Sequence, residues 1–111
     1  MNINQAVQQA YHNAVEKGWH KEERTIGDLI ALMHSELSEA LEEHRKGKSP
    51  NEIYFNEVKT DKPEGIPVEL ADCVIRIFDF CGLHGIDLEA VIKQKMAYNN
   101  KRSFRHGNKT I

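Results

Sequence analysis

The chain has 111 residues, which suits one domain with a real core. With 40% hydrophobic and 29% charged residues and a formal net charge of −2, its composition is that of a globular protein and excludes a disordered chain. Its apolar runs are too short to cross a membrane, and the N-terminus lacks the basic and apolar regions of a secretory signal. The cytoplasm is therefore the expected location. On one helix Cys73 and Cys81 would lie about 12 Å apart, which favours two reduced, buried thiols over a disulfide.

The spacing of apolar residues predicts four helices. Thr25, with Asp28 three residues later, is a suitable N-cap for the second helix. The third helix is apolar on most sides, so it must be buried on most sides, which in a small chain suggests a subunit interface. We expect an all-α, four-helix bundle-like domain with helices at about residues 4–17, 25–46, 67–83 and 88–102.

Two segments are expected to lie outside the helices. Residues 47–67 hold all three prolines and form a long connection, which in a compact domain is usually functional or mobile. The C-terminal tail, about residues 103–111, is basic, because no acidic residue follows Glu89. This tail has three open interpretations: it closes over a bound anion, it binds nucleic acid, or it has no binding role.

Two pairs of carboxylates are the strongest candidates for a functional site. Residues three apart share one face of a helix, so Glu36 pairs with Glu39 on the second helix and Glu69 pairs with Asp72 on the third. Packing these helices together would bring the four acids to one partly buried place, which is unfavourable without a cation. Oxygen ligands favour Mg²⁺, with Mn²⁺ as a substitute. Iron is less favoured, because the di-iron bundle motif Glu-x-x-His is absent from the sequence.

The fourth helix carries a complementary face. Lys95, Asn99 and Arg102 follow one another at spacings of four and three, so one side of this helix is cationic and can donate hydrogen bonds. Metal-bound carboxylates opposite such a face are suited to a polyphosphate, since the cations and the basic side chains stabilise the departing phosphates.

These motifs resemble those of the MazG-like all-α nucleoside triphosphate pyrophosphohydrolases. The pattern E-x-x-E followed by E-x-x-D occurs here as Glu36-Leu-Ser-Glu39 and Glu69-Leu-Ala-Asp72, and residues 93–109 resemble the C-terminal helix and tail of small single-domain members. The resemblance spans roughly residues 25–109. The stretch between the motifs, residues 40–68, is at or just beyond the upper end of the family's usual length.

The resemblance implies a single MazG-like domain over residues 1–111 and a role for each motif residue. Family members cleave between the α- and β-phosphates of a nucleoside triphosphate, release a monophosphate and pyrophosphate, and form tight dimers or dimers of dimers whose neighbouring subunits contribute to each site. The expected substrate is a deoxynucleotide, cleaved for nucleotide-pool housecleaning, and neither nucleic acid nor membrane is the expected partner. The acids would bind Mg²⁺, Glu39 (or Glu36) would activate water, and the fourth helix would hold the phosphates; the implied residues are Glu36, Glu39, Glu69, Asp72, Lys95, Asn99 and Arg102.

Other polar and aromatic residues have simpler interpretations beside a functional one. Trp19 either caps the core or stacks on a nucleobase. His20 is expected in solvent, with base contact as the alternative, and Tyr98 is expected to be packed, with a base or sugar contact as the alternative. Arg76 and Asp79 are expected to form a local ion pair. Glu42 and Glu43 are expected at the surface, although Glu43 could support the metal ligands.

Two rival functions remain open. Another enzyme of the same superfamily, dUTPase-like or a phosphoribosyl-ATP pyrophosphatase, would have the same metal site and a different base pocket. A non-catalytic helical module would instead bind a partner or nucleic acid through the basic tail. Substitution of Glu39 by Gln separates the classes, because only an enzyme would lose turnover.

Overall fold

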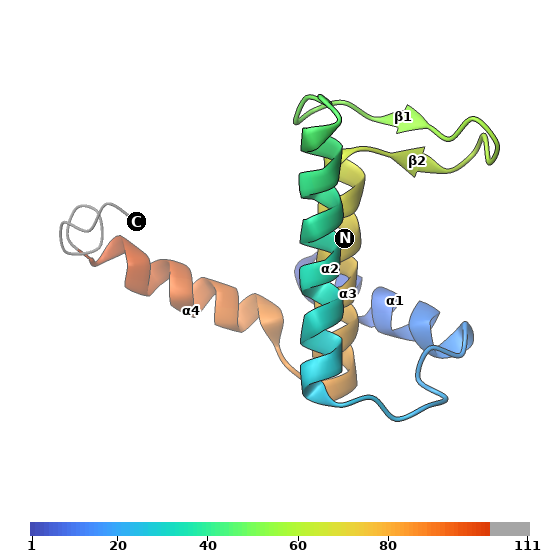
Figure 1. Cartoon of the computed structure of the whole chain (residues 1–111). Helices are drawn as coiled ribbons and strands as arrows, with labels where there is room; N and C mark the ends of the chain where they lie inside the picture. Colours follow the sequence, from blue (N-terminus) through green and yellow to red (C-terminus); the bar gives the residue numbers. More distant parts are fainter. Residues whose placement is uncertain (103–111) are drawn as a thin grey trace.

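The computed structural model describes residues 1–102, and these are mostly helical (Figure 1). The all-α prediction is confirmed, and each expected helix is present within a few residues of its predicted ends. Among the described residues, no helix has the length and apolar character that a membrane crossing requires. The helices are α1 (Ile3–Glu16), α2 (Ile26–Arg45), α3 (Ile66–His84) and α4 (Leu88–Asn100).

The ends of the helices follow from their capping residues. Asn2 and Thr25 each accept a hydrogen bond from the third helical residue, and that residue's side chain accepts one from the cap in return, so α1 and α2 both begin with a capping box. Asp87 accepts from the backbone N–H of Ala90 at the start of α4. α3 ends at Gly85, whose φ of 66° is the left-handed conformation that glycine adopts without strain.

α2 and α3 run side by side in opposite directions, and α1 packs across α3 (Figure 1). Small side chains permit the close approach of α1: a Cβ added at Gly82 would lie 2.4 Å from Cβ of Tyr11. The two cysteines are free, buried thiols, as expected. The small core is drawn from these helices and consists of Ala6, Val7, Ala10, Ala14, Ala40, Cys73 and Cys81.

α4 extends away from the other helices (Figure 1) and has no buried residue. It is attached at its start, where Asn4 donates to Asp87 at 2.8 Å and the backbone N–H of Ile3 donates to Glu89 at 3.2 Å.

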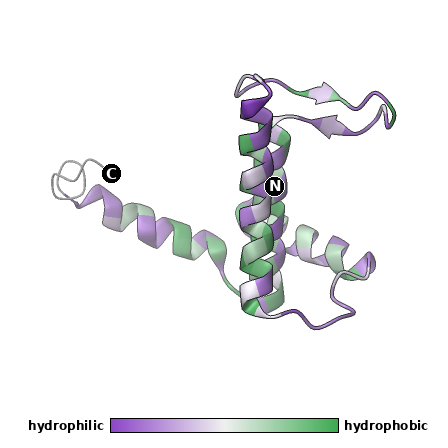
Figure 2. Cartoon of the chain, in the orientation of Figure 1, coloured by the Kyte–Doolittle hydropathy of each residue, from purple (hydrophilic) through white to green (hydrophobic). Residues whose placement is uncertain are grey.

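The expectation that α3 is buried on most sides is not met within one chain, because Leu70 is 45% exposed. Hydrophobic and hydrophilic residues are mixed along the helices, α4 included (Figure 2).

The long connection contains a two-stranded antiparallel hairpin that the sequence did not predict. Strands β1 (Tyr54–Phe55) and β2 (Pro63–Glu64) pair Tyr54 with Glu64 and Phe55 with Pro63. The hairpin ends at Gly65, whose φ of 125° leads directly into α3. A Cβ at this position would lie 2.3 Å from the backbone oxygen of Glu52, so only glycine fits there.

Candidate metal centre

Three of the four predicted acids meet between α2 and α3. Glu36 on α2 and Glu69 and Asp72 on α3 each offer one carboxylate oxygen, and these oxygens lie within 4.8 Å of one another. Glu36 is only 8% exposed, while Glu69 and Asp72 are partly buried. The i,i+3 spacing on α3 and the antiparallel packing of the two helices produce this arrangement. A cluster of this kind is also found without a metal, so its electrostatics decide what it can hold.

Burial and neighbouring charge disfavour ionisation in this cluster. Burial raises the pKa of Glu69 to about 7, and hydrogen bonding with Glu39 and the negative charge of Glu39 and Asp72 add to the rise. Burial and the charge of Glu36 raise the pKa of Asp72. In addition, Oε2 of Glu69 is buried and has no hydrogen-bond partner among the described residues. The cluster therefore contains more negative charge than the protein compensates, and an acceptor oxygen that lacks a donor.

Glu39, the fourth predicted acid, lies at the exposed edge of this cluster. It comes one turn after Glu36 on α2 and its side chain is exposed, yet it is close enough to raise the pKa of Glu69. Glu39 is thus in reach of the same region without belonging to the group of three oxygens. An acid with one side in water is well placed to exchange protons with solvent.

Arg76 lies one turn after Asp72 on α3 and reaches across to α2. Its Nε donates to Oε1 of Glu36 at 2.8 Å. The predicted local pair of Arg76 with Asp79 is therefore wrong: Asp79 is buried and shares a hydrogen bond with Nε2 of His20 instead, at 2.8 Å. The sequence favoured the nearest partner along one helix, whereas packing gave each residue a partner from another segment.

The predicted base-binding residues do not form one pocket. The His20 side chain is only 19% exposed, because it turns inward to Asp79, so the expectation that it faces solvent is wrong. Trp19 beside it is 47% exposed. The cavity that both line has a volume of about 20 Å³, room for little more than a water molecule and too small for a nucleobase. Tyr98 is exposed on α4, so the expectation that it is packed is also wrong.

The predicted phosphate-binding face does not reach the acids within one chain. Lys95, Asn99 and Arg102 lie on α4 or just after it, and α4 projects away from α2 and α3 (Figure 1). Lys95 Nζ lies 4.8 Å, and the Arg102 guanidinium carbon 5.5 Å, from the centre of the Tyr98 ring, so the two cations flank one aromatic side chain. The basic tail, residues 103–111, lies outside the described residues.

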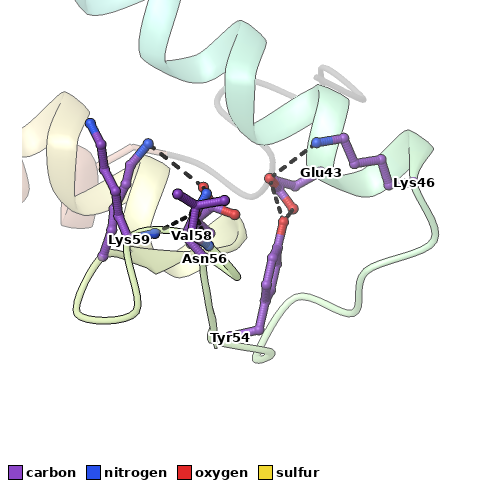
Figure 3. A network of polar contacts seen from close by, with 8 residues as sticks. Glu43, Lys46, Tyr54, Asn56, Val58 and Lys59 are labelled. Carbon is purple, nitrogen blue, oxygen red and sulfur yellow. Dashed lines mark hydrogen bonds and ion pairs between the residues drawn. The ribbon is translucent and has the colours of Figure 1, made fainter.

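The hairpin places polar residues beside the acids. The sequence analysis did not connect these hairpin residues with the acids. The hydroxyl of Tyr54 lies 2.9 and 2.7 Å from the two carboxylate oxygens of Glu43, and this contact raises the Tyr54 pKa to about 12 (Figure 3). Glu43 is only 7% exposed, so its predicted surface position is wrong. One signal was available: Glu43 follows Glu39 by four residues and therefore lies on the face of α2 that carries the motif.

A search of protein-family models, of curated proteins and of solved structures finds no match to this chain. The resemblance to the MazG-like enzymes therefore rests on the identity and spacing of the motif residues. The geometry of these residues gives an independent basis for a functional proposal.

Proposed function

We propose that this chain is a Mg²⁺-dependent nucleoside triphosphate pyrophosphohydrolase that converts a nucleoside triphosphate, preferably a deoxynucleotide, to the monophosphate and pyrophosphate. The observation that carries the proposal is the meeting of Glu36, Glu69 and Asp72 in a partly buried cluster with uncompensated charge. A solvated helix face would not produce a carboxyl with a pKa near 7 or a buried oxygen without a donor.

The residues present fit a hard divalent cation. All three donors are carboxylate oxygens, which Mg²⁺ and Mn²⁺ prefer, and Oε2 of Glu69 lacks any other partner among the described residues. Glu36, Glu69 and Asp72 would hold the ion, with Glu39 completing the set from the exposed edge. When bound, the ion would contact phosphate oxygens and make the α-phosphorus more electrophilic.

The side chains of the cluster have separable tasks in this proposal. Glu39 is exposed and adjacent to the site, so it would accept a proton from the attacking water. Arg76 holds Glu36 in place through its 2.8 Å hydrogen bond and balances part of the local negative charge. Asp72 and Glu69 share one helix face, so α3 fixes their separation. Cleavage at the α-phosphorus would release pyrophosphate.

A homodimer or dimer of dimers would complete the molecule. α4 has no buried residue, although it carries exposed apolar side chains such as Val91 and Met96. α3 exposes Leu70 and Val74 one turn apart. Covering these residues with a second copy would remove apolar surface from water. The second copy could also bring the Lys95, Asn99 and Arg102 face to the acids of the first.

The test of this function is the substitution Glu39→Gln, with Glu22→Gln as the matched control. Both residues are exposed, so neither change should disturb folding, but only Glu39 adjoins the acid cluster. We expect Glu39→Gln to lower turnover of a nucleoside triphosphate by at least about 100-fold and Glu22→Gln to leave it unchanged. Equal turnover in both variants would show that Glu39 takes no part in the reaction, whereas no turnover by the unmodified chain would favour a binding module.

A further inference from the structure

The hairpin brings two lysines to the open side of the acid cluster. A hollow of about 210 Å³ lies among α2, the hairpin and α3. Two of the motif acids, Glu39 and Glu69, line one part of it, so it adjoins the candidate metal centre. Lys46 at the end of α2 and Lys62 next to β2 line another part. The two lysines come from segments that only the return of the hairpin toward α2 brings together.

Both lysines are held loosely. Nζ of Lys46 lies 3.7 Å from Glu43, and Nζ of Lys62 lies 3.6 Å from Glu64. These separations exceed the roughly 2.7–2.9 Å of a charge-assisted hydrogen bond. The side chains are also 61% and 58% exposed, and exposed ion pairs contribute little stability. The ammonium groups can therefore change partners at small cost.

The carboxylates that face these lysines have other donors. Glu43 accepts from the Tyr54 hydroxyl (Figure 3). Glu64 accepts from Nδ2 of Asn56 at 3.1 Å. Neither acid would be left without a hydrogen bond if its lysine turned toward a ligand. The two lysines can therefore turn toward a ligand while both carboxylates keep a hydrogen-bond donor.

The backbone of the hairpin is more firmly fixed than the lysine side chains. The side-chain oxygen of Asn56 accepts from the backbone N–H groups of Val58 and Lys59, both at 2.9 Å. The backbone N–H of Asn56 donates to the carbonyl of Lys62 at 3.0 Å. Lys62 therefore projects from a defined position, and the hairpin is more than a passive connection.

We propose that Lys46 and Lys62 bind the terminal phosphates of the polyphosphate chain, in the same subunit as the acids. This inference rests on the proposed function and assigns part of the phosphate contact to the hairpin, beside that predicted for α4. A lysine ammonium is a compact charge with three donors and suits a phosphate oxygen. Five carboxylates line the same hollow, so the polyphosphate should enter only together with a divalent cation.

The test is isothermal titration of the full chain with inorganic tripolyphosphate in excess Mg²⁺. The variants are Lys46→Ala and Lys62→Ala, and the matched control is Lys59→Ala, in the same hairpin but outside the hollow. We expect each of the first two variants to bind about tenfold more weakly than the unmodified chain. Lys59→Ala should bind as the unmodified chain does. Circular dichroism will establish that the variants fold.

Two results would overturn the inference: no tripolyphosphate binding by the unmodified chain, or equal binding by all three variants. A separate nucleotide hydrolysis assay distinguishes this failure from failure of the proposed function. Nucleotide hydrolysis that does not depend on Lys46 or Lys62 would support the proposed function and refute the contact between the hairpin and the phosphates. Tripolyphosphate binding that depends on the lysines, without hydrolysis of any nucleotide, would support the hairpin contact and refute the catalytic function.

Discussion

Arg76 on α3 donates its Nε to Oε1 of Glu36 on α2 at 2.8 Å, and this ion pair joins the two helices that carry the acidic motifs. Glu36 is buried and also belongs to the group of three carboxylate oxygens. The same guanidinium lowers the pKa of Asp72, opposing the effects of burial and of Glu36. Arg76 is therefore a counter-ion that offsets part of the negative charge of this carboxylate cluster.

Replacement of Arg76 by Met should destabilise the protein by about 1–3 kcal/mol, because it leaves the buried Glu36 carboxylate without its donor. The measurement is urea unfolding with and without Mg²⁺. A divalent cation should restore part of the loss, since it supplies the missing positive charge. A variant as stable as the unmodified chain, with or without Mg²⁺, would show that Arg76 does not balance the cluster.

The elevated pKa of Glu69 predicts a pH-dependent stability. Its folded-state pKa of about 7 exceeds its ordinary value of 4.5, so the folded protein binds more protons between these two values. Stability without metal should therefore fall as the pH rises from about 4.5 to about 7, and then level off. Thermal unfolding in EDTA across this range measures the effect.

The control for this pH dependence is Glu69→Gln, which cannot ionise. It should reduce the fall in stability and raise the melting temperature at pH 8, because the unfavourable charge is gone. It should also weaken the stabilisation that added Mg²⁺ gives the unmodified chain at pH 8. An unchanged pH profile in this variant would place the origin of the pH dependence elsewhere.

Tyr54→Phe should loosen the hairpin while leaving the helices folded. The Tyr54 hydroxyl is the side-chain link from β1 to Glu43 on α2. Its loss leaves that buried carboxylate, among residues 1–102, with the Lys46 ammonium at 3.7 Å as its remaining side-chain partner. Amide hydrogen exchange around residues 54–64 should become about tenfold faster. The matched control is Tyr98→Phe on α4. Unchanged exchange in the hairpin would mean that the strand pairing and the Asn56 hydrogen bonds hold it without the Tyr54 contact.

Leu37→Glu should disrupt self-association. Leu37 and Leu41 are both exposed on α2 and one turn apart, so they form an apolar ridge that a second copy could cover. Light scattering should give two or four times the 12.7 kDa chain mass for the unmodified protein and a smaller assembly for the variant. Val58→Glu, at an exposed position in the hairpin, is the control. A monomeric unmodified chain would contradict the oligomer proposal.

The positions of the motif acids could be predicted because they depend on local geometry. Helical spacing places Glu69 beside Asp72 whatever the rest of the chain does, and the antiparallel packing of α2 on α3 brings Glu36 to the same place. The capping box at Thr25 was equally local and was confirmed. The part of the site that rests on periodicity was therefore accessible from the sequence.

The remaining contacts depend on how distant segments return to one another. The pairing of Tyr54 with Glu43 requires the hairpin, whose two-residue strands are too short to leave an alternating pattern. The pairing of His20 with Asp79 joins residues 59 positions apart. The direction of α4 is set by the turn after Gly85 and by the Asn4 contact with Asp87, so its separation from the acids could not be predicted from its own cationic face.

Pyrophosphohydrolase activity is measured by incubating the purified chain with each common deoxynucleoside and ribonucleoside triphosphate, in Mg²⁺ and in EDTA, and resolving the products by anion-exchange chromatography. We expect a nucleoside monophosphate and pyrophosphate in Mg²⁺, and neither product in EDTA. A diphosphate with inorganic phosphate would place the attack at the γ-phosphorus. That result, or no Mg²⁺-dependent product from any of the nucleotides, would show that the chain is not a pyrophosphohydrolase of these substrates.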